Sequence, residues 1–357
     1  MTVDTLFSWL GGLIPALEGS GILLVISILV LCLALFLVVA VNAIVMVYAE
    51  RKVSAFMQDR VGPMGQGVGL HAGKWGLLQT VADALKLLTK EDIIPEKADR
   101  FLFILAPFVI FIGAFVTIIA VPFGETIIVA DFNIGIFYIL AMGSFGVIGI
   151  ILAGWSSNNK WSLYGGMRSA AQIVSYEIPA GLSIIVIIML TGTLSMQGII
   201  EYQAGGMGNW IIFANPFTFI AFFIYFISVI AETNRTPFDI PEAESELVGG
   251  FHTEYSGMRW SFFFLSEYAN MLVVCAVAAA GFLGGWHSPM SGYFDSNGWG
   301  IFWMVSKIVF LIFIMMWFRW TFPRLRVDQL MNICWKVFLP MSLINIFGVG
   351  IWTLFFG

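Results

Sequence analysis

Long apolar segments alternate with shorter polar ones along most of the chain. Eight of these apolar segments have about the 20 residues that a helix needs to cross a bilayer. They span 21–48, 101–122, 134–154, 170–190, 213–232, 261–284, 300–319 and 335–356. Strand-like alternation is absent from them, which argues against a membrane β-barrel. The pattern predicts an all-α polytopic membrane protein with about eight transmembrane helices, forming a single integral membrane domain over 1–357.

The stretch WGLLQTVADALKLLTK, at 75–90, has a different periodicity from the eight apolar segments. Its apolar residues recur at helical spacing and its charged residues fall between them: Leu77, Leu78, Val81, Leu85 and Leu88 against Asp83, Lys86 and Lys90. This is typical of an amphipathic helix that lies at a membrane interface rather than crossing it. The helix falls within a long loop at about 49–100.

Lysine and arginine fall on alternate sides of the predicted spans. They occur after spans 1, 3, 5 and 7, and they are missing from the loops after spans 2, 4 and 6 and from both termini. Positive residues favour cytoplasmic loops, so the long loops are expected in the cytoplasm and both termini outside. The N-terminus has no basic region and no small-residue cleavage site typical of a signal peptide. Lys307 is the exception, because it lies within span 7.

Composition narrows the possible chemistry. The chain is 59% hydrophobic and 11% charged, with a net charge of −5, which gives no reason to expect nucleic-acid binding. Cys32, Cys275 and Cys334 share no metal-ligand spacing and suit small packing positions. The three histidines do not form axial pairs within spans, and no dinucleotide or phosphate-binding fingerprint is present. We therefore expect no metal, haem, flavin or iron–sulfur cluster bound by this chain.

Carboxylates concentrate between residues 231 and 257. Six of them fall in this acidic loop: Glu232, Asp239, Glu242, Glu244, Glu246 and Glu254. Pro241 suits the start of a helix, which would place Glu242 and Glu246 on one face. Carboxylates close to hydrocarbon titrate as coupled groups, which suits proton transfer. The alternative is a solvated loop that caps a helix, but Glu232 and Glu254 extend the cluster toward the apolar spans and favour proton transfer.

Ionisable residues also occur inside or next to predicted spans. Glu177 lies one or two turns inside span 4, and Glu267 enters span 6 in the same way. Such a carboxylate faces a cavity, pairs with a cation or stays protonated; the alternative is a packing contact at the headgroup boundary. Lys307 is the only candidate for a buried cation within a span, and its pairing with either acid is left open.

A mixed-charge cluster follows span 1 in AERKVSAFMQDRVGP, at 49–63. Lys52 suits a positive anchor on the cytoplasmic side. Arg51 and Arg60, interleaved with Phe56 and Met57, fit either the same anchor or the wall of an apolar cleft that donates to a carbonyl ligand. Composition does not separate these two interpretations.

Five stretches together resemble one family. They are AERKVSAFMQDRVGP, LLQTVADALKLLTKE, GWSSNNKWSLYGGMRSAAQIVSYEIP, AETNRTPFDIPEAESELVGGFHTEYSG and FLSEYANML. In this order they are similar to the H-subunit family of bacterial respiratory complex I, the counterpart of mitochondrial NADH dehydrogenase subunit 1. The resemblance runs from about residue 45 to 335.

The resemblance implies a quinone-chamber and coupling subunit of a proton-pumping NADH:quinone oxidoreductase. Quinone would be the substrate, and this chain would carry no redox centre. Its partners would be the hydrophilic-arm subunits that carry the terminal iron–sulfur cluster, the adjacent small membrane subunits, and lipid. The location would be the bacterial inner membrane, with both termini periplasmic.

The matching motifs also imply roles for particular residues. Those expected at the quinone chamber and its entry are Glu50, Arg51, Phe56, Arg60, Arg168 and Arg235. Those expected to couple protons are Asp83, Glu177, Glu232, Asp239, Glu242, Glu244, Glu246, Glu254 and Glu267.

Two alternatives remain open from the sequence. One is a homologous membrane subunit of a ferredoxin- or hydrogenase-linked complex, which shares this architecture. The other is a stand-alone cation transporter. Transporters often contain internal repeats, and the two halves of this chain show none.

Overall fold

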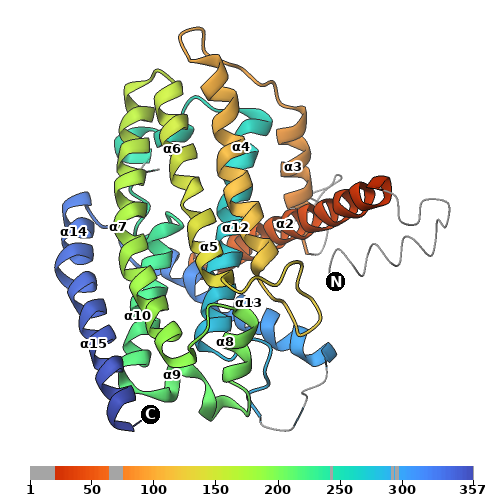
Figure 1. Ribbon diagram of the computed structural model, residues 1–357. Coiled ribbons are helices and arrows are strands. Elements are labelled where there is room, and N and C mark those ends of the chain that lie inside the picture. Colours follow the sequence, from red (N-terminus) through yellow and green to blue (C-terminus); the bar gives the residue numbers. More distant parts are fainter. Residues whose placement is uncertain (1–20, 64–74, 242–243, 291–292, 294–296, 357) are drawn as a thin grey trace.

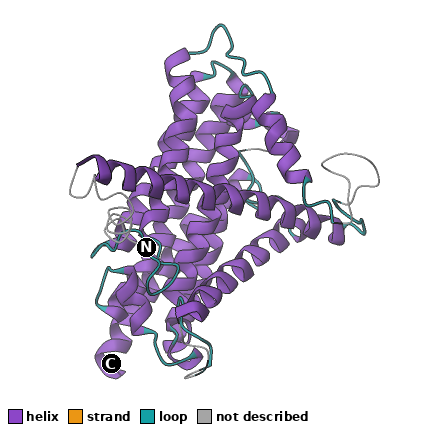
Figure 2. Cartoon of the chain, turned by 90° about the vertical axis from the view of Figure 1, so that its right-hand side faces the viewer, coloured by secondary structure: helices purple, strands orange, loops and turns teal. Residues whose placement is uncertain are grey.

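The computed structural model describes residues 21–63, 75–241, 244–290, 293 and 297–356, and within these it is built from helices and loops, without a β-strand (Figure 2). The α-helices are α2 (Gly21–Met57), α3 (Gln79–Thr89), α4 (Arg100–Thr117), α5 (Gly135–Gly143), α6 (Phe145–Ser156), α7 (Lys160–Thr191), α8 (Met196–Tyr202), α9 (Ile211–Ala214), α10 (Pro216–Glu232), α11 (Glu244–Leu247), α12 (Gly257–Phe282), α13 (Asn297–Thr321), α14 (Val327–Ile333) and α15 (Leu339–Phe356). The structure also contains four short turns of other helix types. Three are 3-10 turns, at Ile118–Ala120 (η2), Met207–Asn209 (η3) and Gly250–His252 (η4), and one is a π-helical turn at Cys334–Phe338 (η5).

The predicted polytopic all-α class is confirmed. Seven helical segments of the described chain are long and apolar enough to cross a membrane, and α10 is a shorter apolar helix of 17 residues. At 1.5 Å per residue, α10 is about 26 Å long, close to the thickness of a hydrocarbon core. These eight elements correspond to the eight apolar segments.

The helices α4, α6, α7, α10 and α12 stand side by side in an upright bundle, with α15 packed against α7 and α10 (Figure 1). Helix α2 runs across this bundle and contacts α12 and α13. The centre of the core is α12, whose run from Met271 to Phe282 is buried throughout. Most of that run is alanine, valine and glycine, and such small residues let neighbouring helices approach closely.

Two helices extend beyond the predicted spans. Helix α2 continues to Met57, so Glu50, Arg51 and Phe56 are helical rather than part of a loop. Helix α7 begins at Lys160, before the start of predicted span 4, so Glu177 lies near the middle of the helix. The α7 start is fixed by the Asn159 side chain, which accepts a hydrogen bond from the Trp161 amide at 2.9 Å.

The glycines of α7 explain why a polar, glycine-rich segment remains helical. An added Cβ at Gly165 would lie 2.6 Å from the Cα of Gly250, and one at Gly166 would lie 3.3 Å from the Cα of Gly154. Helix α7 therefore packs backbone against backbone on both the acidic loop and α6. The sequence shows only the low helix propensity of glycine, and this packing outweighs it.

A helix does follow Pro241. Within the described residues it comprises Glu244–Leu247, and residues 242–243 lie outside the description. The backbone turns at once, because Val248 has φ of 67° and Gly250 has φ of 57°. The third predicted span is also divided, into α5 and α6, at Ser144.

The amphipathic helix is confirmed as α3, with Thr80 buried and Leu77, Leu85 and Leu88 exposed. Its position at a membrane interface stays a prediction. An exposed row of leucines is what such a position requires.

Lys307 has no carboxylate partner among the described residues. Its ammonium donates to the carbonyl oxygens of Gly285 and His287, both at 2.8 Å, and lies 4.3 Å from the Trp210 ring centroid. These carbonyls follow the C-terminal end of α12, where a positive charge is favourable. Lys307 therefore holds the segment between α12 and α13 and pairs with neither Glu177 nor Glu267.

Replacing Gly165 by alanine should destabilise the protein, whereas replacing Gly181 in the same helix should not. The first substitution forces a Cβ against the backbone of Gly250, an overpacking that costs about 1–3 kcal/mol. At Gly181 an added Cβ meets nothing within 4 Å, and alanine gains up to about 1 kcal/mol of helix propensity. Thermal unfolding midpoints in detergent should move in opposite directions; equal midpoints would contradict the packing described.

Candidate functional site

Several of the predicted site residues line one cavity of about 390 Å³ between α2, α12, α13 and the segment after α10. We call it the arginine cavity. Its lining is Val47, Glu50, Arg51, Ser54, Arg235, His252, Trp260, Phe264, Glu267, Tyr268, Arg319 and Trp320. The volume and the mixture of aromatic walls with a few charged groups are typical of a site for a small organic molecule.

Glu50 is the centre of this cavity's charge network. Its side chain is buried, accepts a hydrogen bond from the Tyr268 hydroxyl at 2.5 Å, and forms an ion pair with Arg319. Arg235 lies 3.5 Å from the same carboxylate. A carboxylate is tolerated in the interior when it is both paired and hydrogen-bonded, and Glu50 meets both conditions.

Arg235 extends the network from Glu50 toward α12. Its guanidinium is 3.5 Å from Glu267 and lies over the Tyr268 ring, 4.7 Å from the centroid. The charges therefore alternate in sign from Arg319 through Glu50 and Arg235 to Glu267. These contacts join segments that are far apart in the chain.

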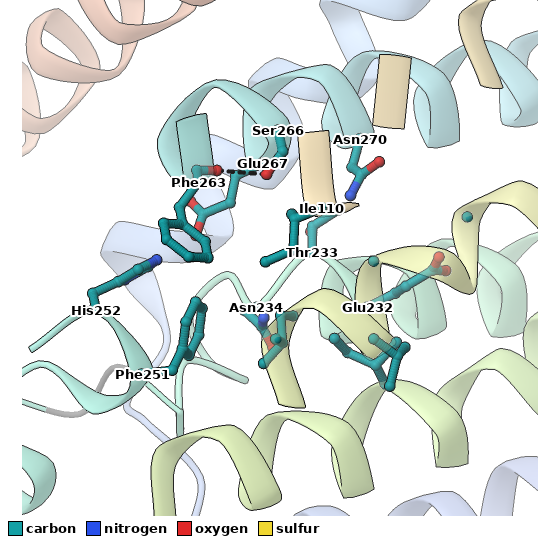
Figure 3. Close-up of a pocket in the computed structure, with 15 residues that line it drawn as sticks. Ile110, Glu232, Thr233, Asn234, Phe251, His252, Phe263, Ser266, Glu267 and Asn270 are labelled. Atoms are coloured by element: carbon teal, nitrogen blue, oxygen red, sulfur yellow. Dashed lines mark hydrogen bonds between the residues drawn. The ribbon is translucent and has the colours of Figure 1, made fainter. Parts of the chain in front are cut away.

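A second, smaller cavity of about 40 Å³ lies beside the arginine cavity, and we call it the inner cavity. His252 and Glu267 line both. Figure 3 shows His252 and Phe251 at one side of the inner cavity and Glu232 and Asn270 at the other. A water molecule needs about 10–15 Å³ and several polar partners, so this space suits water.

A third cavity of about 30 Å³, the deep cavity, continues from the inner one. Gly143, Glu232 and Asn270 line both. Its other polar lining residues are Thr117 and Tyr225, and the rest of its wall is apolar. Three spaces in series, each sharing side chains with the next, thus lead from the arginine cavity into the bundle.

Glu232 and Glu177 are the carboxylates nearest to the bundle interior. Glu232 is the last residue of α10, and its Oε1 lies 3.9 Å from the position of a Cβ added to Gly143. Glu177 is close enough for its charge to act on Glu232, and it lies near Ser144 at the α5–α6 break. Within the described chain neither forms an ion pair with lysine or arginine.

The other described carboxylates of the acidic loop are held elsewhere. Asp239 pairs with Arg324 at 3.1 Å, and burial raises the pKa of Asp239 despite that arginine. Glu246 is exposed and pairs with Arg168 at 2.7 Å. Glu254 accepts a hydrogen bond from the Asn159 side chain at 2.6 Å. These contacts fix the loop to neighbouring helices and do not line the three cavities.

Two predicted residues of the loop are not described in full. Glu242 lies outside the described residues, and Glu244 begins α11 with its side chain outside the description. Their expected part in proton coupling stays a prediction.

The residues expected at the quinone chamber divide into two groups. Glu50, Arg51 and Arg235 line the arginine cavity, and Arg51 also pairs with Asp83 of α3 at 2.5 Å. Phe56 is 78% exposed, and Phe56 and Arg60 lie away from this lining. Arg168 lies with Glu246, as described above. The motif AERKVSAFMQDRVGP thus supplies both residues that line the cavity and residues that do not.

Sequence reasoning missed several lining residues. In the sequence, Arg319 served only as one of the positive residues after span 7 that predict the orientation in the membrane. In the structure it pairs with Glu50 from the end of α13. Tyr268 directly follows Glu267, and Asn270 lies three positions after it, a spacing that places it near Glu267 on the helix. His252 lies in the acidic loop with no local signal for its role. Among the described residues no cluster of His, Cys, Asp or Glu could hold a metal ion.

Replacing Glu50 by glutamine should be strongly destabilising, because it leaves Arg235 and Arg319 facing a buried neutral amide. Breaking a buried pair in this way costs about 3–5 kcal/mol. Tyr268→Phe removes one hydrogen bond to a charged group and should cost about 1.5–3 kcal/mol. The exposed Asp59→Asn is the control. Thermal unfolding in detergent should rank the three in this order; a Glu50 variant as stable as the control would contradict the network.

A family model described as NADH dehydrogenase matches residues 29–350. The H subunit of NADH-quinone oxidoreductase from Chlorobaculum tepidum is 54% identical over 318 residues, which cover 86% of this chain and 87% of the relative. The first of the H subunits of Geobacter sulfurreducens is 48% identical over 355 residues, covering 94% and 97%. The H subunit of Bacteroides fragilis is 46% identical over 346 residues, covering 95% and 94%. The chain therefore belongs to the NADH dehydrogenase family, as a membrane subunit of the NADH-quinone oxidoreductase H type.

Proposed function

We propose that the arginine cavity receives the headgroup of a quinone and that the inner and deep cavities carry the linked protons. Reduction of a quinone to a quinol consumes two electrons and two protons. In this proposal partner subunits of the complex supply the electrons, and negative charge develops on the quinone oxygens. Arginine donors in a partly enclosed site stabilise such charge.

The chemistry of the lining supports a quinone in particular. Trp260, Phe264 and Trp320 provide apolar walls for a planar ring, while the guanidinium groups of Arg51 and Arg319 provide N–H donors for carbonyl oxygens. Glu50 keeps the arginines in place and compensates their charge, so that the site is not a general anion trap. A neutral ligand whose charge changes during the reaction fits this balance.

The single observation that carries the proposal is the continuity of the three cavities. Each shares side chains with the next, and the shared groups are mostly ionisable or polar: His252 and Glu267, then Glu232 and Asn270. A change of charge in the arginine cavity acts on Glu267 through Arg235. From there the next carboxylates inward are Glu232 and Glu177, which have no neutralising cation among the described side chains and suit groups that gain and lose protons.

The assembly and orientation form part of the same proposal. Arginines and lysines gather with the acidic loop at one end of the bundle, which we place in the cytoplasm against the hydrophilic-arm subunits that carry the terminal iron–sulfur cluster. Both termini then face the periplasm of a bacterial inner membrane, and small membrane subunits and lipid cover the apolar sides. The relatives' names favour an NADH-fed complex over a ferredoxin- or hydrogenase-linked one and over a stand-alone cation transporter.

Replacing Glu232 by glutamine in the assembled complex should abolish most proton pumping. The neutral side chain keeps the shape of the cavities but cannot exchange a proton. We expect the proton flux into proteoliposomes per NADH oxidised to fall at least tenfold, and Glu177→Gln to act in the same direction. The flux is measured with a pH-sensitive dye.

The matched control for this test is Glu201→Gln, an exposed glutamate on α8 that lines none of the three cavities. It should pump as the wild type does. If the Glu232 variant assembles and pumps at the wild-type ratio, the proposed proton route is wrong.

A further inference from the structure

His252 occupies the junction between the arginine cavity and the inner cavity. Of the residues that line either space, only His252 and Glu267 line both. Every route between the two spaces along described side chains therefore passes one of these two groups.

The backbone at His252 is held firmly against α7. Gly250, two residues before it, is in backbone contact with Gly165, and the Phe251 carbonyl accepts a hydrogen bond from Ser162 at 3.3 Å. The position of the imidazole is thus set by helix packing as well as by the local sequence. A side chain that is placed this rigidly can have a defined role between two cavities.

Aromatic rings surround the imidazole of His252. Its centroid lies 4.0 Å from that of Phe251, 5.1 Å from that of Phe263 and 6.4 Å from that of Trp260. In Figure 3 the ring extends toward Phe263 and Glu267. The surroundings of the imidazole at this junction are therefore mainly aromatic. The imidazole itself is a group that can accept and release a proton there.

Glu267 is a poorer carrier than His252, although it lines the same junction. Its carboxylate is within 3.5 Å of Arg235, and an adjacent guanidinium favours the deprotonated form. A neutral imidazole has one ring nitrogen that accepts a proton and one that releases a proton. Uptake at one nitrogen and loss from the other moves one proton across the junction and leaves the ring neutral.

We propose that His252 is the group that passes protons between the arginine cavity and the inner cavity. This inference rests on the proposed function and adds to it the residue at which the two spaces are joined. One proton enters on the side of Glu267 and Arg235, and one leaves toward Glu232. Rotation of the ring or exchange with water then restores the starting tautomer.

The surroundings disfavour the protonated form of the imidazole. Burial lowers the pKa of His252 to about 4, and the charge of Glu267 opposes this shift. The charged groups that line the two cavities come from five segments: Glu50 and Arg51 on α2, Glu232 on α10, Arg235 after it, Glu267 on α12 and Arg319 on α13. Added negative charge in the arginine cavity stabilises the imidazolium, so the transfer is favoured when quinone is being reduced.

The test uses the assembled complex in proteoliposomes with the variants His252→Leu and His252→Gln. Glutamine keeps hydrogen-bonding groups at the junction but has no proton to exchange near neutral pH. We expect both variants to lower the proton flux per NADH oxidised at least tenfold. His287→Gln, which changes a histidine outside all three cavities, should keep the wild-type flux.

The pH profile separates proton transfer from a structural role. Above the pKa, the fraction of protonated imidazole falls about tenfold per pH unit, so wild-type flux should decline as the pH rises from about 6 to about 9. The residual flux of both variants should lose this dependence. A structural role would instead be rescued by glutamine, with the profile unchanged, and would overturn the inference.

The result for Glu232→Gln distinguishes the two proposals. Loss of pumping in Glu232→Gln with wild-type pumping and pH profile in His252→Gln would refute the role of His252 and leave the proposed function intact. Wild-type pumping in Glu232→Gln would refute the proposed function itself. If His252→Leu does not assemble, His252→Gln alone decides, because its size and polarity are close to those of histidine.

Discussion

The buried carboxylate of Glu50 is the constraint on which the site depends. It brings together Arg235, Arg319 and Tyr268, and so joins α2, the segment after α10, α12 and α13 around one point. Without it, two guanidiniums would remain in an apolar interior with insufficient compensation. Ion pairs between oppositely charged side chains therefore hold together the helices that form the walls of the arginine cavity.

The apolar pattern was sufficient to predict the eight apolar helical segments, because the bilayer imposes their length. It could not predict where α7 begins or how soon α11 ends. Both depend on tertiary contacts, chiefly the close approach of Gly165 to Gly250 and the left-handed backbone at Val248. Such contacts leave no periodic signal in the sequence.

The site was predicted in part. A run of carboxylates in sequence suggested one cluster, but the fold separates its described members: Glu232 faces the cavities, whereas Asp239, Glu246 and Glu254 bind neighbouring elements. Residues contributed singly by other helices, such as Arg319, have no neighbouring motif that would identify them. The positions of charged residues in the sequence thus indicate the region of the site. Only the packing of the helices shows which charged side chains form pairs.

The contacts of the acidic loop have a mechanical consequence. The segment binds α7 through Arg168, the α6–α7 turn through Asn159 and the α13–α14 connection through Arg324. Because the acidic loop contacts three separate places, it cannot move relative to one of them without changing its contacts with the other two. A displacement of this loop would therefore act on α7, the α6–α7 turn and the α13–α14 connection at the same time.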